Sequence, residues 1–174
     1  LINGGSGSLG TAAIQIAKYY GAHVTAVCST ANIKLVRSLG ADEAIDYTKT
    51  DFTQNKNSYD LIYDTVGSRS FEECKHALTE NGCYASPVLG IPLIGQMMVT
   101  SLFGNKKAKF SATGSLPKEE IKRLLHLLLD IIKAGHFVAP VDRTYNLEQV
   151  VEAHSYVDKG RKKGNVVLKP FALT

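Results

Sequence analysis

Apolar residues recur along this chain with two different periods, which alternate from one segment to the next. After the short apolar opening at 1–3, a helix face is predicted by apolar side chains spaced three and four positions apart, at Leu9, Ala12, Ala13, Ile16, Ala17 and Tyr20. Gly21 ends that helix, and the run 23–27 predicts a strand after it. A strand, a glycine-rich turn, a helix and a second strand in this order indicate a βαβ unit.

The same alternation continues through the middle of the chain. Further helices are predicted over 32–39 and 70–79, and further strands over 43–46, 59–64, 83–86 and 109–113. Strands that alternate with helices are typical of a parallel sheet with helices on both faces. We therefore predict an α/β fold with a doubly wound parallel sheet.

The last third of the chain begins with a helix that opens at Pro117 and ends before Gly135. Its middle, 124–132, is apolar on nearly every side, so this helix needs neighbours on more than one face. A last helix is predicted over 146–160, and a closing strand over 165–168.

Composition and charge narrow the class of protein. The chain has 174 residues, of which 44% are hydrophobic and 21% charged, as in a globular domain that buries its own core. The formal net charge is +4, and the last sixteen residues alone hold five basic side chains and no acidic one. Because a nucleic-acid-binding protein spreads basic residues over a face with aromatic residues among them, we expect no nucleic-acid partner.

Cysteine usage and hydropathy exclude further classes. Cys28, Cys74 and Cys83 form no CxxC pair, so neither a disulfide framework nor a four-ligand zinc site is expected in this chain. The longest uncharged stretch, 81–105, is interrupted by prolines and glycines and is not expected to cross a membrane. We expect a cytoplasmic protein without a signal peptide.

The sequence Gly5-Ser6-Gly7-Ser8-Leu9-Gly10 fits the pattern GxGxxG between a predicted strand and a predicted helix. In this pattern Gly5 permits a tight turn, Gly7 lets backbone N–H groups approach a pyrophosphate, and Gly10 lets the helix pack closely on the sheet. We therefore predict a Rossmann-type dinucleotide-binding site. A glycine turn in another Rossmann-like fold, such as a methyltransferase, is the alternative.

The end of the second predicted strand indicates which dinucleotide binds. An NAD site places Asp or Glu about 20 residues beyond the motif, whereas this chain has Cys28-Ser29-Thr30-Ala31-Asn32 there. Small hydroxyl side chains leave room for a 2′-phosphate, and the bases Lys34 and Arg37 follow. The pattern favours NADPH over NADH.

Four segments of the chain have counterparts, in the same order, in a known protein family. They are the glycine turn with its helix (4–18), 40–47, 60–67 and 164–168. In this order they resemble the medium-chain dehydrogenase/reductase superfamily, and within it the quinone oxidoreductase branch that lacks zinc. The resemblance spans nearly the whole chain.

The resemblance implies contacts along the whole cofactor. Backbone N–H groups of Ser8 and Leu9 would face the pyrophosphate. The side chains that would border the adenosine 2′-phosphate are Ser29, Thr30 and Tyr47. The segments that would approach the adenosine half and the nicotinamide are Asp64-Thr65-Val66-Gly67 and Leu89-Gly90, respectively. The family's usual lysine after the second strand is replaced by Asn32.

The resemblance also implies a second domain, a GroES-like domain that precedes the glycine turn and supplies most of the substrate pocket. Residues 1–135 would then form the NADP-binding Rossmann domain with a truncated first strand. Residues 136–174 would belong with the absent domain, and the chain would be a fragment of a longer reductase.

We therefore expect the cofactor-binding part of an NADPH-dependent oxidoreductase that transfers hydride to a quinone or an α,β-unsaturated carbonyl. Its substrate would be a small molecule, and its candidate assembly a homodimer through the strand at 109–113. No residue is assigned as a general acid, and no zinc is expected in this chain. The alternatives are a zinc-dependent alcohol dehydrogenase of the same superfamily and a non-catalytic dinucleotide-binding module that acts as a sensor or in protein interactions.

Overall fold

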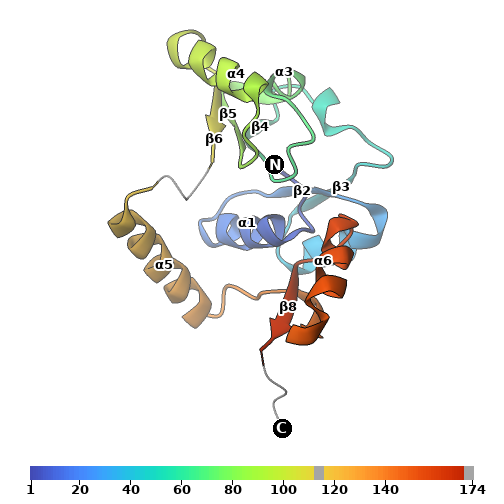
Figure 1. The fold of residues 1–174 in the computed structure, drawn as a ribbon. Helices are drawn as coiled ribbons and strands as arrows, with labels where there is room; N and C mark the ends of the chain where they lie inside the picture. The colour runs from blue at the N-terminus through green and yellow to red at the C-terminus, as the bar shows by residue number, and fades with distance from the viewer. Residues whose placement is uncertain (112–115, 171–174) are drawn as a thin grey trace.

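The computed structural model describes residues 1–111 and 116–170, which form a parallel sheet flanked by helices (Figure 1). The sheet has six strands in the order β3-β2-β1-β4-β5-β6, the order of a Rossmann fold. The strands are β1 (Ile2–Asn3), β2 (Thr25–Cys28), β3 (Glu43–Asp46), β4 (Tyr59–Asp64), β5 (Leu78–Ser86) and β6 (Lys107–Phe110). The predicted doubly wound parallel sheet is confirmed.

Helices lie in the connections between these strands and after the last of them. The helices are α1 (Ser8–Tyr19), α2 (Ile33–Ser38), α3 (Phe71–Cys74), α4 (Ile91–Leu102), α5 (Lys118–Lys133) and α6 (Val150–Asp158). Two apolar clusters hold α1 to α4 to the sheet. One lies among β1, β2, α1 and α2 around Ile14 and Val36, and the other lies around Phe71, Ile62 and Leu78.

The buried face of α1 differs from the predicted one. Leu9 and Tyr20, at the two ends of the predicted apolar face, are 51% and 61% exposed, whereas Gly10, Thr11, Ile14 and Gln15 are buried. The prediction was wrong at the two ends of the face, whereas its members Ala13 and Ala17 pack against a core cluster. Two of the buried positions serve purposes other than apolar burial. Gly10 permits backbone contact, and Gln15 hydrogen-bonds the C-terminal segment.

The helix predicted over 70–79 is shorter than expected, and the strand after it is longer. Helix α3 ends at Cys74, and β5 begins at Leu78 rather than at Cys83. Tertiary contacts explain the difference, because the Lys106 ammonium donates to the carbonyls of Lys75 and Leu78, both at 2.7 Å. These carbonyls are thereby held away from a continued helical ladder.

The C-terminal segment forms a second, two-stranded parallel sheet from β7 (Val141–Asn146) and β8 (Asn165–Lys169). Strand β8 was predicted, but β7 was not, because 141–146 has a single aliphatic residue among polar ones. The last helix, α6, begins at Val150, one short 3₁₀ turn after the predicted start.

Helix α5 lies at the side of the sheet in Figure 1 with little cover. Ile131 is its buried side chain, whereas Leu125 and Leu129 are about half exposed. The predicted strand at 109–113 is observed as far as Phe110, and its positions 112–113 lie outside the described residues. Within those residues, none of the helices combines the length and hydropathy needed to cross a bilayer.

The contact of α1 with the glycine turn gives a prediction about stability. A Cβ on Gly10 would lie 2.2 Å from the carbonyl oxygen of Gly4 and 2.7 Å from the Cα of Gly5. Because backbone atoms cannot move aside cheaply, we expect Gly10→Ala to reduce the free energy of unfolding by about 3 kcal/mol. Urea denaturation measures the change.

The matched control is Gly95→Ala in the middle of α4, where a Cβ would meet no atom within 4 Å. That variant should be neutral, or more stable by up to about 1 kcal/mol through helix propensity. Equal unfolding midpoints for Gly10→Ala and the unmodified chain would contradict the close approach.

Candidate functional site

The turn between β1 and α1 has two kinds of glycine. Gly5 and Gly10 face protein, since a Cβ on Gly5 would lie 2.9 Å from the Cβ of Ala26 and one on Gly10 would strike the backbone. A Cβ on Gly7 would meet only the Gly4 carbonyl oxygen, at 3.5 Å. Gly5 and Gly10 are therefore required for packing, and Gly7 leaves its outer side open for a ligand.

The N-terminus of α1 has unused capacity for an anion. Gly7 is its N-cap and offers no side-chain bond, and no acidic residue lies in the first turn. The first N–H groups of a helix have no partner within the helix, and the helix dipole places partial positive charge there. Ser8 and Leu9 carry two of these N–H groups, as the pyrophosphate prediction requires.

A cleft of about 1220 Å³ opens beside this turn. Its walls come from the glycine turn, the end of β2, the segments that follow β3 and β4, and residues 159–163 of the C-terminal segment. The predicted site residues that line it are Gly7, Ser8, Leu9, Ser29, Tyr47 and Val66. The predicted site residues outside its lining are Gly5, Gly10, Thr30, Lys34, Leu89 and Gly90.

The side chains expected around a 2′-phosphate lie in different surroundings. Ser29 lines the cleft, whereas Lys34 is exposed on α2 and outside the lining. The Thr30 hydroxyl donates to the carboxylate of Asp46. The hydrogen bond from Thr30, with two from Thr48, lowers the pKa of Asp46, so this carboxylate stays charged at the end of β3.

Asn32 joins the glycine turn to the end of β2. Its side-chain amide donates to the hydroxyls of Ser6, at 3.0 Å, and Ser29, at 3.2 Å. Asn32 is 9% exposed, and its Oδ1 has no hydrogen-bond partner among the residues that the structure describes. No sequence pattern indicates this bridge, because its members are separated by up to 26 positions.

A buried carboxylate shapes the loop after β4. Asp64 is fully buried and accepts hydrogen bonds from five groups: the Asn3 amide, the Tyr84 hydroxyl and the backbone N–H groups of Val66, Gly67 and Arg69. These bonds hold Val66 at the cleft wall. Five donors offset the cost of burying one charge.

The C-terminal segment docks on the glycine turn and on α1. Gln15 makes two hydrogen bonds with the backbone of Val138, one at 2.9 Å as donor and one at 2.7 Å as acceptor. The Ser8 hydroxyl donates to the Gly164 carbonyl at 2.7 Å, and the Gly164 N–H donates to the Ser6 carbonyl at 2.8 Å. The segment from 136 onward therefore forms part of the cleft wall.

The cleft has an excess of positive charge, which includes the basic run Arg161-Lys162-Lys163. From the sequence, this run is interpreted as a solvated turn, with a position near the cofactor as the alternative. Its basic lining residues are Arg69, Lys159, Arg161, Lys162 and Lys163, and its acidic one is Asp51. Asp51 pairs with Arg69 at 3.2 Å. Within residues 1–111 and 116–170, the other four have no ion pair. The run of bases without acids in the last sixteen residues is the signal that could have found them.

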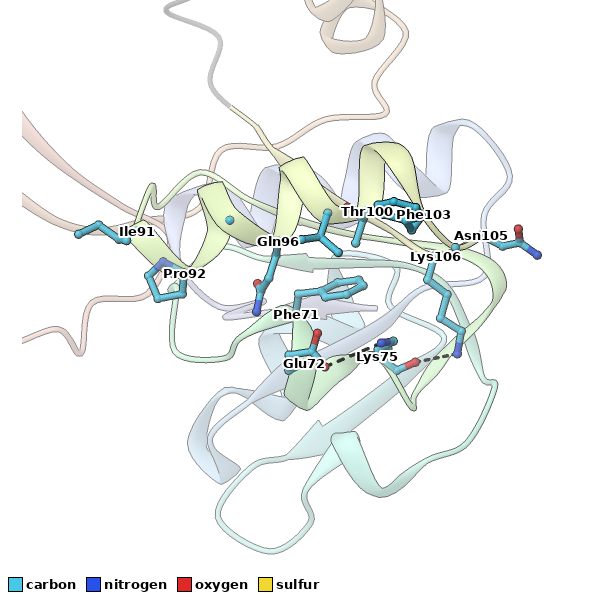
Figure 2. Close-up of a pocket in the computed structure, with 13 residues that line it drawn as sticks. Phe71, Glu72, Lys75, Ile91, Pro92, Gln96, Thr100, Phe103, Asn105 and Lys106 are labelled. Carbon is cyan, nitrogen blue, oxygen red and sulfur yellow. Dashed lines mark hydrogen bonds and ion pairs between the residues drawn. The ribbon is translucent and has the colours of Figure 1, made fainter.

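The predicted nicotinamide contacts, Leu89 and Gly90, directly precede α4 and are not among the residues that line this cleft. Near them is a separate hollow of about 510 Å³ between α3 and α4 (Figure 2). Its lining is mostly apolar, with Phe71, Pro92 and Phe103 among its residues. It shares no residue with the larger cleft. The larger cleft is the candidate functional site, because six of the predicted site residues line it.

Comparison with known proteins identifies the family. A family model described as zinc-binding dehydrogenase matches residues 39–168. The chain belongs to this family. The predicted membership of the medium-chain dehydrogenase/reductase superfamily is confirmed by relatives that are quinone and enone oxidoreductases. Among the described residues, no group of three His, Cys, Asp or Glu side chains could hold a metal ion.

Three curated relatives of this dehydrogenase chain are reductases. The trans-enoyl reductase pgmF of Aspergillus terreus is 31% identical over 97% of the chain and 50% of its own length. The 2-methylene-furan-3-one reductase of Solanum lycopersicum is 32% identical over 98% of the chain and 40% of its own length. The mitochondrial NAD(P)H oxidoreductase RTN4IP1 of Mus musculus is 31% identical over 97% of the chain and 47% of its own length.

Solved structures of the dehydrogenase family have the same fold. The quinone oxidoreductase from Coxiella burnetii superposes with a TM-score of 0.81 and 27% sequence identity, over 98% of this chain and 52% of its own. The chain thus spans about half the length of the relatives it matches.

The buried carboxylate gives a second prediction. Asp64→Ala removes the acceptor of five hydrogen bonds, so we expect the free energy of unfolding to fall by about 3–5 kcal/mol. Asp60→Ala is the control on the same strand, because Asp60 is exposed and accepts from the Thr79 hydroxyl. That variant should change stability by no more than about 0.5 kcal/mol. Chemical denaturation of both variants tests this, and similar losses for the two would refute the role of Asp64.

Proposed function

We propose that this chain is the NADPH-binding part of a reductase that transfers hydride to a quinone or an α,β-unsaturated carbonyl. The observation that carries the proposal is the N-terminus of α1 beside a cleft with four basic side chains that form no ion pair within the described residues. Such a site suits the diphosphate of a dinucleotide. The reductase relatives support the reaction class.

The proposed contacts follow the lining of the cleft. Ser8 and Leu9 would bind the diphosphate through backbone N–H groups, with Gly7 allowing its close approach. Ser29 and Tyr47 would border the adenosine ribose and its 2′-phosphate, and Val66 the adenosine half. When bound, the nicotinamide would supply the hydride, and the residues of this chain would orient the cofactor and exclude water from it.

The preference for the phosphorylated cofactor rests on the end of β2. Ser29 is there at the cleft wall, and β2 and the 3₁₀ turn that follows carry no acid. The carboxylate of Asp46 is at the end of β3, where hydroxyls of Thr30 and Thr48 occupy it. A relative that is named an NAD(P)H oxidoreductase supports a nicotinamide cofactor.

The cellular location and the oligomeric state are also proposals. Cys28, Cys74 and Cys83 are free thiols, in keeping with a cytoplasmic location, although the relatives include a mitochondrial protein. Strand β6 is at the edge of the sheet, and a homodimer would form through it.

The cofactor preference can be tested by placing an acid at the end of β2. We expect Ser29→Asp to weaken NADPH binding at least tenfold, about 1.4 kcal/mol, because the new carboxylate repels the 2′-phosphate. NADH, which lacks that phosphate, should lose less. Isothermal titration with both cofactors measures the effect. Ser38→Asp, at the exposed end of α2 outside the cleft, adds the same charge and should leave both affinities unchanged.

The chain studied alone gives a further prediction. It contains the glycine turn and the end of β2 but spans about half the length of its reductase relatives. We expect it to bind NADPH measurably and to reduce quinones negligibly, because hydride transfer needs the acceptor held at roughly 3–3.5 Å from the donor carbon. Titration with NADPH and a quinone assay on the same sample decide this. Rapid turnover, or no binding by a folded chain, would contradict it.

A further inference from the structure

The ammonium group of Lys162 lies at the N-terminus of α1. It donates to the hydroxyl of Ser8, the first residue of α1, at 2.5 Å and to the Gly164 carbonyl at 2.8 Å. An ammonium has three N–H donors. Two are used by these bonds, so one remains for a ligand in the cleft that Lys162 lines.

The charge of Lys162 has no direct counter-ion within residues 1–111 and 116–170, where no carboxylate oxygen forms an ion pair with it. Burial lowers its pKa, and the charge of Asp142 opposes that change. The Asp142 carboxylate already accepts from the Tyr156 hydroxyl at 2.6 Å and from the Lys163 N–H at 3.0 Å. A half-buried cation in this setting is stabilised by an anion that enters the cleft.

We propose that Lys162 recognises the diphosphate bridge of the dinucleotide, as a cation brought to the N-terminus of α1 by the C-terminal segment. This inference rests on the proposed function and adds a residue to that site. The diphosphate of a dinucleotide is expected at the N-terminus of the first helix. Ser8 belongs to that turn, and the Lys162 ammonium is within hydrogen-bond distance of it.

Lys162 differs from the other three basic residues of the segment in its contacts. Lys159, Arg161 and Lys163 are exposed, whereas Lys162 is half-buried. Its side chain is the one that hydrogen-bonds a residue of α1. The exposed three supply a diffuse positive field, and Lys162 supplies a directed contact.

The same ammonium also connects the ligand to the fold. Its bond to the Gly164 carbonyl holds the start of β8 against the glycine turn, together with the bond from the Gly164 N–H to the Ser6 carbonyl. A diphosphate bound by Lys162 would therefore favour the docked C-terminal segment. By linkage, a docked segment would favour the cofactor.

The test compares three ligands that share an adenosine and differ in the diphosphate. NADPH and ADP contain it, and adenosine 2′-monophosphate does not. We expect Lys162→Gln to weaken binding of NADPH and ADP by about tenfold to a hundredfold, the range of a charge-assisted hydrogen bond. Binding of adenosine 2′-monophosphate should change less than about twofold, and Lys162→Arg should restore most of the affinity.

The control is Lys169→Gln, an equal change of charge at an exposed position of β8 outside the cleft. It should leave all three affinities unchanged. Equal losses for the three ligands with Lys162→Gln, or no loss at all, would overturn the proposal. If the unmodified folded chain binds none of the ligands, it is the proposed function that fails.

A second measurement uses the unmodified chain, so it does not require the variant to fold. Saturating NADPH should slow amide hydrogen exchange of Gly164 in the unmodified chain, because the ligand would strengthen the bonds around Lys162. Unchanged exchange of Gly164 on saturation would overturn the linkage and with it the proposed contact. Exchange at Ile131 in α5, which is outside the cleft, is the internal reference.

Discussion

The first turn of α1 lies against the backbone of the glycine turn with no space for a side chain between them. A Cβ on Gly10 would come within 2.2 Å of the Gly4 carbonyl oxygen. This approach fixes the axis of α1 relative to β1. It also fixes the direction of the unpaired N–H groups at the cleft and the reach of Gln15 to the backbone of Val138. The proposed anion site at the end of the helix and the docking of the C-terminal segment thus depend on one backbone contact.

Hydrogen bonds rather than apolar packing organise the residues around the cleft. Asp64 is buried with five donors, and three of these are N–H groups of the loop that follows it, so the carboxylate determines the conformation of that loop. Asn32 similarly ties Ser6 to Ser29. Buried polar groups that are nearly all paired hold one arrangement, since any other leaves a donor or an acceptor without a partner. Among the described residues, Oδ1 of Asn32 is a buried side-chain atom without a partner, and it lies next to the glycine turn where the ligand is proposed to bind.

Local patterns were sufficient for several strands and for the glycine turn. The strands at 43–46 and 59–64 are found with the predicted bounds, because short segments with β-branched or aromatic residues between turn residues specify them. What the sequence could not predict depends on distant contacts. The buried face of α1 includes Gln15 because of a partner 123 positions away, and Lys162 reaches Ser8 across 154 positions. The spacing of apolar residues predicts which apolar side chains are buried. It cannot predict that a polar side chain is buried because it forms a hydrogen bond with a distant segment.

The net charge of +4 comes from one segment of the chain, the last sixteen residues. Of the five bases near the C-terminus, all but Lys169 line the cleft, and the acid among the lining residues is already paired with Arg69. The dipole of α1 adds positive potential at the same place. Cations gathered in a cleft repel one another, and this repulsion is relieved by an anion bound between them. A neutral ligand would leave it unchanged. The arrangement of the charges, more than their number, therefore favours an anionic ligand, as the proposed dinucleotide is.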